Sequence, residues 1–344
     1  MFKFISLLLN FKVKNMNRKS LLFGAILLLI AIKGMAQGPW VYGSFDNIFD
    51  DREYFSGQAN SQTILGARFD AGIAFKVDSV HQIAAGMNYM FEYGSDPFAL
   101  KPVPDLYYKY SIDHFRAFFG SFPRYKLLNF PLALLTDSIL YYRPNIQGGL
   151  MEASGDWGYQ NAFCDWTGRQ TPTVHEAFMA GISGHIKYSI IYFEDYFYMY
   201  HFAGLIDNPT WVQDNGGGAF YVGIDLAGKT ILDKCNFDIG GVTSYFRVRP
   251  ADYNHIWGMQ GRASLFYKFF GIDATYYKGG KLFLVWGDLF YRSGNYGRLD
   301  TYLKLIKTKH VDTKIDWSFH FVKGYAVDNS YQVMIRIDFP FNKN

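Results

Sequence analysis

The feature of this sequence that most constrains its fold is a period-two alternation of apolar and polar residues in long runs. Leu65, Phe69 and Ile73 fall on one face of such a run, and Arg68 and Asp70 fall on the other. The same pattern recurs in three further segments, residues 82–94, 314–323 and 331–341. Because successive side chains of a β-strand point to opposite faces, the pattern predicts strands with one face in an apolar medium and one in a polar medium.

A soluble β-sandwich gives the same alternation, and strand length separates the two folds. Many of the runs reach ten or more residues. Strands of soluble proteins are usually about 5–6 residues long, whereas a tilted membrane strand needs about 9–11. Aromatic residues make up 19% of the chain and end many apolar faces, as they do at membrane interfaces. We therefore predict an all-β, transmembrane antiparallel β-barrel.

The runs number sixteen. Their approximate bounds are 39–48, 61–76, 80–94, 104–111, 114–122, 147–155, 157–166, 174–185, 187–203, 217–227, 232–247, 256–268, 271–278, 297–308, 312–323 and 329–341. An even number of strands places both termini on the periplasmic side. The connections then sort into short periplasmic turns, such as 77–79, and long external loops, such as 123–146, which is the asymmetry of outer-membrane barrels.

The N-terminus predicts export. Residues 1–20 contain five Lys and Arg and no acid, the run 21–32 is uncharged and apolar, and small residues precede a cut after Ala36. A membrane anchor is the alternative, but about 20 apolar residues are needed to span. We expect a signal peptide over 1–36 and one outer-membrane barrel over 37–344. The latter has 28 Lys and Arg against 30 Asp and Glu, a net charge of −2, so nothing suggests a nucleic-acid partner.

The whole chain resembles Gram-negative outer-membrane porin-type barrels. The resemblance rests on the signal, the alternating strands, the aromatic last strand 331–341 and the segment 286–300. It implies passive diffusion of small hydrophilic solutes, with outer-membrane lipid and the barrel-insertion machinery as partners and a homo-oligomer as an open alternative. One departure concerns the C-terminus: such barrels often end on Phe, whereas three residues follow Phe341 here.

Charged residues of both signs fall on the predicted inner faces of the strands. A ring of opposed charges at a narrow point selects ions or small polar solutes. The alternative is that arginine–carboxylate pairs brace the wall. The residues expected to line the pore are Arg68, Asp70, Glu92, Arg116, Asp225, Asp238, Arg262, Asp273, Arg298, Asp300, Lys304, Asp316, Arg336 and Asp338.

The connection 123–146 is too apolar for a loop that is freely exposed to water. In the porins that the chain resembles, the third external loop folds inward and narrows the channel. Arg124, Asp137 and Arg143 would then point at the constriction. Packing of the loop on the barrel rim or at a subunit contact is an equally weighted alternative.

Catalytic motifs are weak. Ser183 with His185, and Ser318 with His320, lie two residues apart, as a nucleophile and its base might. Both pairs face the predicted lumen, whereas an outer-membrane phospholipase works at the lipid-facing surface. We therefore predict a porin-like channel that is not an enzyme and uses no metal or cofactor. The alternatives are a non-conducting structural or surface-display barrel and an outer-membrane lipid hydrolase.

Overall fold

A computed structural model describes residues 39–207, 212–306 and 308–341 of the chain. The predicted signal peptide, 1–36, lies outside the described residues, so this prediction and the domain boundary after it stay predictions. The described residues form sixteen strands: Trp40–Glu53 (β1), Gln62–Lys76 (β2), His81–Glu92 (β3), Val103–Ile112 (β4), Phe115–Pro123 (β5), Asn145–Gly155 (β6), Gly158–Gly168 (β7), Ala177–Tyr188 (β8), Ile191–Phe202 (β9), Gln213–Asp225 (β10), Lys234–Val248 (β11), Asn254–Tyr267 (β12), Phe270–Gly279 (β13), Asn295–Leu303 (β14), Val311–Val322 (β15) and Asp328–Phe341 (β16).

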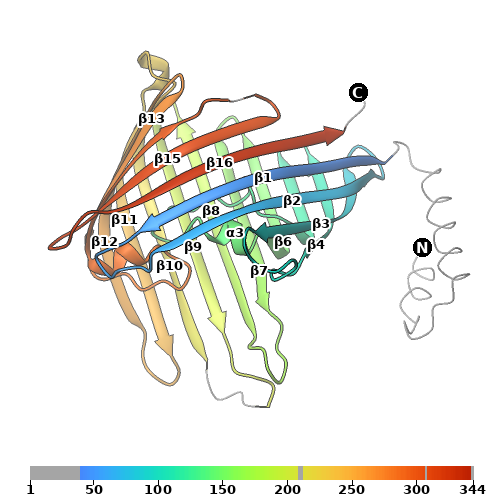
Figure 1. The fold of residues 1–344 in the computed structure, drawn as a ribbon, viewed down its shortest axis with the longest axis horizontal. Coiled ribbons are helices and arrows are strands. Elements are labelled where there is room, and N and C mark those ends of the chain that lie inside the picture. The colour runs from blue at the N-terminus through green and yellow to red at the C-terminus, as the bar shows by residue number, and fades with distance from the viewer. Residues whose placement is uncertain (1–38, 208–211, 307, 342–344) are drawn as a thin grey trace, which may run out of the picture.

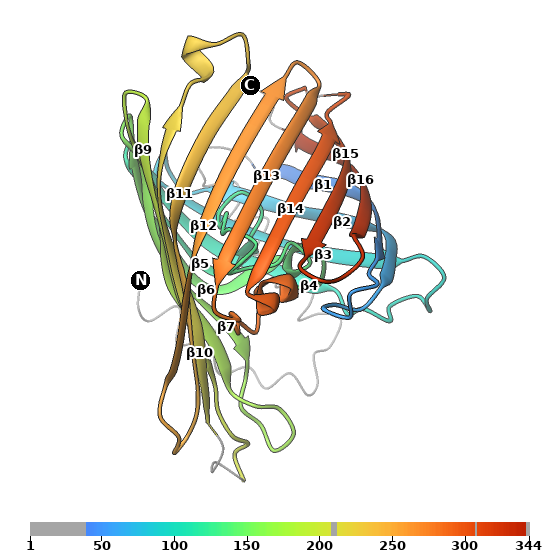
Figure 2. The ribbon, with the colours of Figure 1, turned by 90° about the vertical axis from the view of Figure 1, so that its left-hand side faces the viewer.

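These strands close into one antiparallel barrel. Each pairs with its neighbours in sequence, and β1 pairs with β16 from Val41 opposite Phe341 to Glu53 opposite Asn329. Figure 1 shows β16 beside β1, and Figure 2 shows the wall curving from β9 and β10 round to β16. The predicted fold class, an antiparallel barrel of about sixteen strands, is confirmed.

The two ends of the barrel differ. At one end, β1 begins and β16 finishes, and several connections are only two residues long, such as 113–114, 156–157 and 189–190. The other end carries the long connections 124–144 and 280–294. We call these the turn end and the loop end. In outer-membrane barrels the short turns face the periplasm and the long loops face outward.

The alternation sorts side chains between the two faces of the wall. Phe69 is 53% exposed on the outside, and its neighbour Arg68 is 6% exposed on the inside. Phe220 and Trp257 are likewise exposed outward. No helix in the described part of the chain is long and apolar enough to cross a membrane.

The interior of the barrel is packed. Leu134 and Ile139 from the first long connection meet Leu284 and Phe290 from the second, and together they pack on inward strand residues such as Tyr198. The two connections also bond each other, because Thr136 N donates to the Trp286 oxygen at 2.7 Å and Asp288 N donates to the Leu132 oxygen at 2.9 Å. The loop thus lies inside the barrel, where Ile139–Tyr142 forms the short helix α3 (Figure 1).

The inner face is less polar than the sequence pattern predicts. Phe122, Phe163, Tyr196 and Tyr198 point inward from β5, β7 and β9 and are buried against the luminal loops. At these positions both faces of the strands are apolar, because the outside meets lipid and the inside meets the loop core. The expected hydrated lumen is therefore interrupted by an apolar layer.

The outward placement of Phe69 predicts a strong effect of charge there. Phe69→Arg, near the middle of β2, should reduce the free energy of unfolding by about 2–4 kcal/mol, since an arginine near the bilayer midplane faces hydrocarbon. Leu305→Arg is the control, because Leu305 is 60% exposed in the connection between β14 and β15. Urea unfolding in vesicles measures both, and equal losses would show that the outer wall at Phe69 does not contact lipid.

Candidate functional site

Two cavities lie in the lumen on either side of the loop 124–144. The turn-end cavity lies between this loop and the turn-end halves of the strands, and its lining includes Asp46, Arg68, Asp70, Tyr125, Tyr141, Lys304, Lys314 and Arg336. The loop-end cavity lies between the two luminal loops and the loop-end parts of β1, β14, β15 and β16. Its lining includes Arg52, Tyr54, Thr136, Asp137, Ser138, Asp288, Phe290, Arg298, His320, Ser330 and Gln332.

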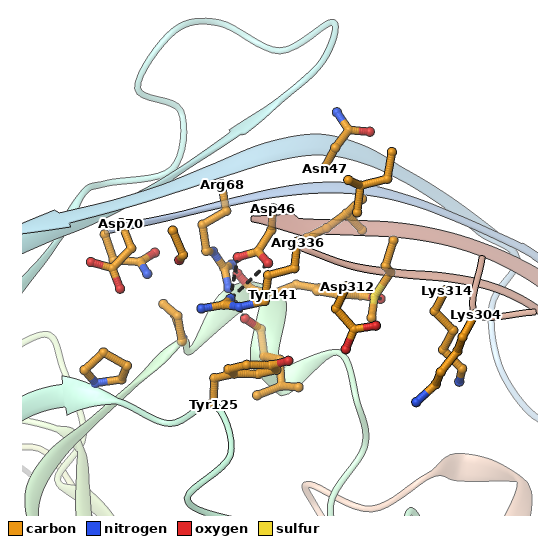
Figure 3. A pocket seen from close by; sticks show the side chains of 18 residues that line it. Asp46, Asn47, Arg68, Asp70, Tyr125, Tyr141, Lys304, Asp312, Lys314 and Arg336 are labelled. Atoms are coloured by element: carbon orange, nitrogen blue, oxygen red, sulfur yellow. Dashed lines mark hydrogen bonds and ion pairs between the residues drawn. The ribbon is translucent and has the colours of Figure 1, made fainter. Parts of the chain in front are cut away.

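The charges of the turn-end cavity are engaged with the protein itself. Arg336 pairs with Asp46 at 2.9 Å and with Asp338 at 2.8 Å, and its guanidinium lies 4.0 Å from the centre of the Tyr125 ring. Arg68 donates to the carbonyl oxygens of Leu140 and Tyr141 in the luminal loop. Figure 3 shows Arg68 and Arg336 pointing toward one another beside Asp46. These contacts attach the loop to the wall.

The loop-end cavity contains a histidine with one free ring nitrogen. His320 Nδ1 lies 2.6 Å from the Tyr296 hydroxyl. His320 Nε2 is buried and has no hydrogen-bond partner among the described residues. The Phe290 ring stacks on the imidazole with centroids 4.3 Å apart, and Tyr54 meets its edge at 5.4 Å. The imidazole is therefore held in one orientation by three aromatic neighbours.

Two arginines line the same cavity. Arg52 pairs with the buried Asp50 at 2.6 Å and lies 3.5 Å from Asp137 of the luminal loop. Gln332 bridges these two carboxylates, with its amide nitrogen 3.0 Å from Asp50 and 3.2 Å from Asp137. This network joins β1 and β16 to the loop and holds the positively charged Arg52 side chain at the cavity surface.

The second arginine, Arg298, connects the wall to the other luminal loop. It pairs with Asp300 at 2.7 Å, lies 3.8 Å from Asp288, and donates to the Ser318 hydroxyl oxygen at 3.0 Å. The ring nitrogen of His320 and the two guanidinium groups line one cavity. The imidazole can accept a proton, and the guanidinium groups can stabilise negative charge that develops on a substrate.

The two loop carboxylates that line the cavity titrate differently. Burial raises the pKa of Asp288 to about 6, against the opposing charge of Arg298. Burial also acts to raise the pKa of Asp137, but Arg52, Arg298 and the Gln332 hydrogen bond outweigh it and hold that pKa below its ordinary value. Asp288 is therefore the loop carboxylate that can carry a proton near neutral pH.

Most charged strand residues that were predicted to line a pore form pairs along the wall. The pairs are Arg116 with Glu152, Arg262 with Asp238 and Glu194, Arg298 with Asp300, Lys314 with Asp316, Lys187 with Asp225, and Lys234 with Asp273. Glu92 accepts a hydrogen bond from Tyr142 at 2.9 Å. Asp70, Lys304 and Arg336 lie around the turn-end cavity, and Asp338 is bound to Arg336.

The three loop residues that were expected at a constriction lie in different places. Asp137 lines the loop-end cavity. Arg124 is fully buried and pairs with the equally buried Asp165 of β7. Arg143 donates to the Thr167 oxygen at 2.8 Å and lies over the Trp286 ring. The two arginines therefore fix the loop at its base.

The pair Ser318 and His320 does not form a nucleophile–base dyad. Both side chains are buried and face inward, but Nδ1 of the histidine binds Tyr296, and the serine hydroxyl accepts from Arg298. Tyr296, Arg52 and Asp288 were not singled out from the sequence as functional residues. In the described part of the chain, no group of three or more His, Cys, Asp or Glu side chains could hold a metal ion.

Comparisons with known proteins give a family and a fold. A family model described as lipid A 3'-O-deacylase-type matches residues 44–342. Comparison with curated proteins finds no match. A loop-deletion mutant of OmpT, an outer-membrane protein of Vibrio cholerae, is 8% identical with a TM-score of 0.54 over 88% of this chain and 99% of that one. An anion-selective porin from Comamonas acidovorans is 9% identical, with the same TM-score and coverage. Likeness at these identities shows a shared outer-membrane barrel fold alone.

The raised pKa of Asp288 predicts a pH dependence of stability. Its folded pKa lies above the unfolded value of 3.8, so between about pH 4 and 6 the folded state binds the proton more tightly. Its contribution to the free energy of unfolding therefore falls as pH rises through this window, by up to about 3 kcal/mol. Asp288→Asn should lose this component.

Denaturant unfolding of the barrel in micelles between pH 4 and 7 measures the difference between wild type and variant. Asp137→Asn is the control of opposite sign, because a lowered pKa gives stability that is lost as pH falls. Parallel curves for wild type and Asp288→Asn would contradict the assignment.

Proposed function

Because this chain belongs to the lipid A 3'-O-deacylase-type family, we propose that it is an outer-membrane hydrolase that removes an acyl chain from lipid A, with its reaction centre in the loop-end cavity. The observation that carries the location is His320, a buried histidine whose Nε2 has no partner among the described residues and which lines one cavity together with Arg52 and Arg298. The 3'-O position of the cleaved ester is part of the same proposal.

The family assignment corrects two predictions made from the sequence. The chain was predicted to be a porin-like channel for small hydrophilic solutes and not an enzyme, but its family is named for a hydrolase. The alternating sequence pattern predicts the wall of the barrel, which porins share. It does not predict the contents of the lumen, where an apolar core of two loops packs against inward aromatic residues. The lipid-hydrolase alternative fits the family better.

The proposed chemistry is ester hydrolysis with histidine as general base. In the tautomer whose Nδ1–H donates to the Tyr296 oxygen, Nε2 presents its lone pair to the cavity. Nε2 takes a proton from water, and the hydroxide oxygen bonds to the ester carbonyl carbon. The tetrahedral oxyanion is stabilised by Arg52 or Arg298, whose guanidinium groups line the cavity.

Collapse of this intermediate breaks the bond between the carbonyl carbon and the sugar oxygen. The histidinium returns its proton to that oxygen, so one water and one ester give a fatty acid and a free hydroxyl. The cavity is luminal, so the ester of a lipid must reach it over the loop-end rim of the barrel, and the position of the cavity along the strands agrees with this route. Arg52 is near the loop end of β1 and His320 near the loop end of β15, and the loop end faces the outer leaflet, which lipid A occupies.

Replacement of the proposed base tests this assignment. His320→Ala should lower the rate of fatty-acid release from lipid A by about 10²–10⁴-fold, the usual contribution of a general base. His185→Ala is the matched control, since His185 also lies inside the wall two residues after a serine but pairs with Glu194 instead of lining the loop-end cavity. Mass spectrometry of released fatty acid measures both. Equal rates for the two variants would place the base elsewhere.

A second variant separates a water mechanism from a serine nucleophile. Ser318→Ala should keep at least a tenth of the wild-type rate, because Ser318 binds Arg298 and not His320. Accumulation of an acyl-enzyme in wild type, together with full loss of fatty-acid release in Ser318→Ala, would mean that Ser318 is the nucleophile.

A further inference from the structure

Three charged side chains and a histidine gather on the outer wall at the loop end of β9, β10 and β11. They are His201, Asp214, Arg247 and Arg249. Their outward direction follows from their neighbours, which point inward. Asn215 donates to the Phe283 oxygen of a luminal loop, Phe246 packs on the Phe283 ring, and Tyr200 meets Trp286. Because side chains alternate along a strand, Asp214, Arg247 and His201 face away from the lumen.

This cluster presents an exposed guanidinium group. Asp214 accepts from Arg247 at 2.5 Å, from His201 at 2.9 Å and from Arg249 at 3.3 Å. Asp252 is a second carboxylate that acts on Arg247. Arg249 has one contact with Asp214 at 3.3 Å, and its side chain is 51% exposed, so part of its guanidinium is open to a ligand. Tyr253 lies under Arg247, with its ring centre 4.0 Å from the guanidinium. The cluster therefore sits among aromatic rings of the kind that mark a membrane interface.

An apolar groove lies on the same outer wall, nearer the middle of the barrel. Its floor is made by Gly218 and Gly241, and its flanks include Phe197, Phe220 and Trp257. A Cβ on Gly218 would lie 3.0 Å from the Tyr196 oxygen, and a Cβ on Gly241 would meet the Phe220 ring at 2.7 Å. A side chain at either position would have to displace its neighbours, so the wall stays low at these two glycines.

The cluster and the groove are in line along the strands. Gly218 follows Asp214 by four residues on β10, which at about 3.3 Å a residue is about 13 Å deeper in the wall. Between them Tyr245 covers Gly216, where a Cβ would lie 2.6 Å from the tyrosine oxygen. A molecule that filled both places would need an anionic head and an apolar chain.

We propose that this wall patch, formed by His201, Arg247, Arg249 and the groove at Gly218 and Gly241, binds one lipid A molecule from the outer leaflet, with a phosphate on the arginines and an acyl chain in the groove. An exposed guanidinium at the membrane interface attracts an anionic lipid headgroup, and an acyl chain is what the bilayer offers to fill an apolar groove. The patch lies on β9 to β12, whereas the loop-end cavity lies on β14 to β16 and β1. The lipid held there is therefore not the one being cleaved, and this proposal does not rest on the proposed function.

Native mass spectrometry of the barrel with lipid A tests the patch. All proteins carry His320→Ala, so that hydrolysis does not alter the ligand and the result is independent of activity. Arg247→Gln with Arg249→Gln should weaken the binding of one lipid A molecule at least tenfold and leave a molecule bound in the loop-end cavity in place. Lys278→Gln with Lys281→Gln removes the same charge from two other exposed positions at the loop end and should change it less than twofold. Trp257→Ala, at a position 72% exposed, should weaken binding through the groove without affecting folding.

The source of the phosphate is tested with two other lipids. Lipid A without phosphates should bind the unsubstituted patch as weakly as lipid A binds the double arginine variant. Phosphatidylglycerol should bind more weakly than lipid A. Unchanged lipid A binding in the double arginine variant would overturn the site, and equal binding of phosphatidylglycerol would overturn lipid A as its occupant.

Discussion

The structure depends on the requirement that every backbone N–H and C=O within lipid be hydrogen-bonded inside the protein. A sheet meets it only by closing, which here means that β1 pairs with β16 along thirteen residues. Closure at sixteen strands has a cost, because a barrel of this size encloses more space than its own inward side chains can fill. The two long luminal connections fill part of that space, and the site lies where they meet the wall.

The luminal loops are held by two kinds of contact. Apolar residues such as Leu134 pack on inward aromatic residues of the wall, and charged residues fix the loop ends, as the buried pair of Arg124 and Asp165 does. Where the apolar packing stops, the lining becomes polar, and the loop-end cavity lies at this boundary. His320 has both apolar and polar neighbours. Phe290 covers its ring, and the histidine lines the same cavity as Arg52 and Arg298.

The sequence was sufficient for the wall and insufficient for the lumen. Strand number and the two unlike ends follow from the alternation. The apolarity of the loop 123–146 indicates that it is covered, but leaves an inward course and packing at the rim or at a subunit contact equally weighted. Tyr196 and Tyr198 break the alternation because their inner face meets a loop more than fifty residues away. The bond between His320 and Tyr296 depends on the register of β14 against β15, which spacing along one strand does not reveal. The Ser318–His320 pair can be found from spacing along one strand. The contact between His320 and Tyr296, which lie on different strands, cannot.

The loop-end cavity takes residues from both ends of the chain. Arg52 comes from the first strand, and Ser330 and Gln332 come from the last. Gln332 reaches the Asp50–Arg52 pair only when these strands are side by side. The cavity is therefore completed by the same step that seals the wall. Activity of the proposed hydrolase would begin only once the barrel has closed.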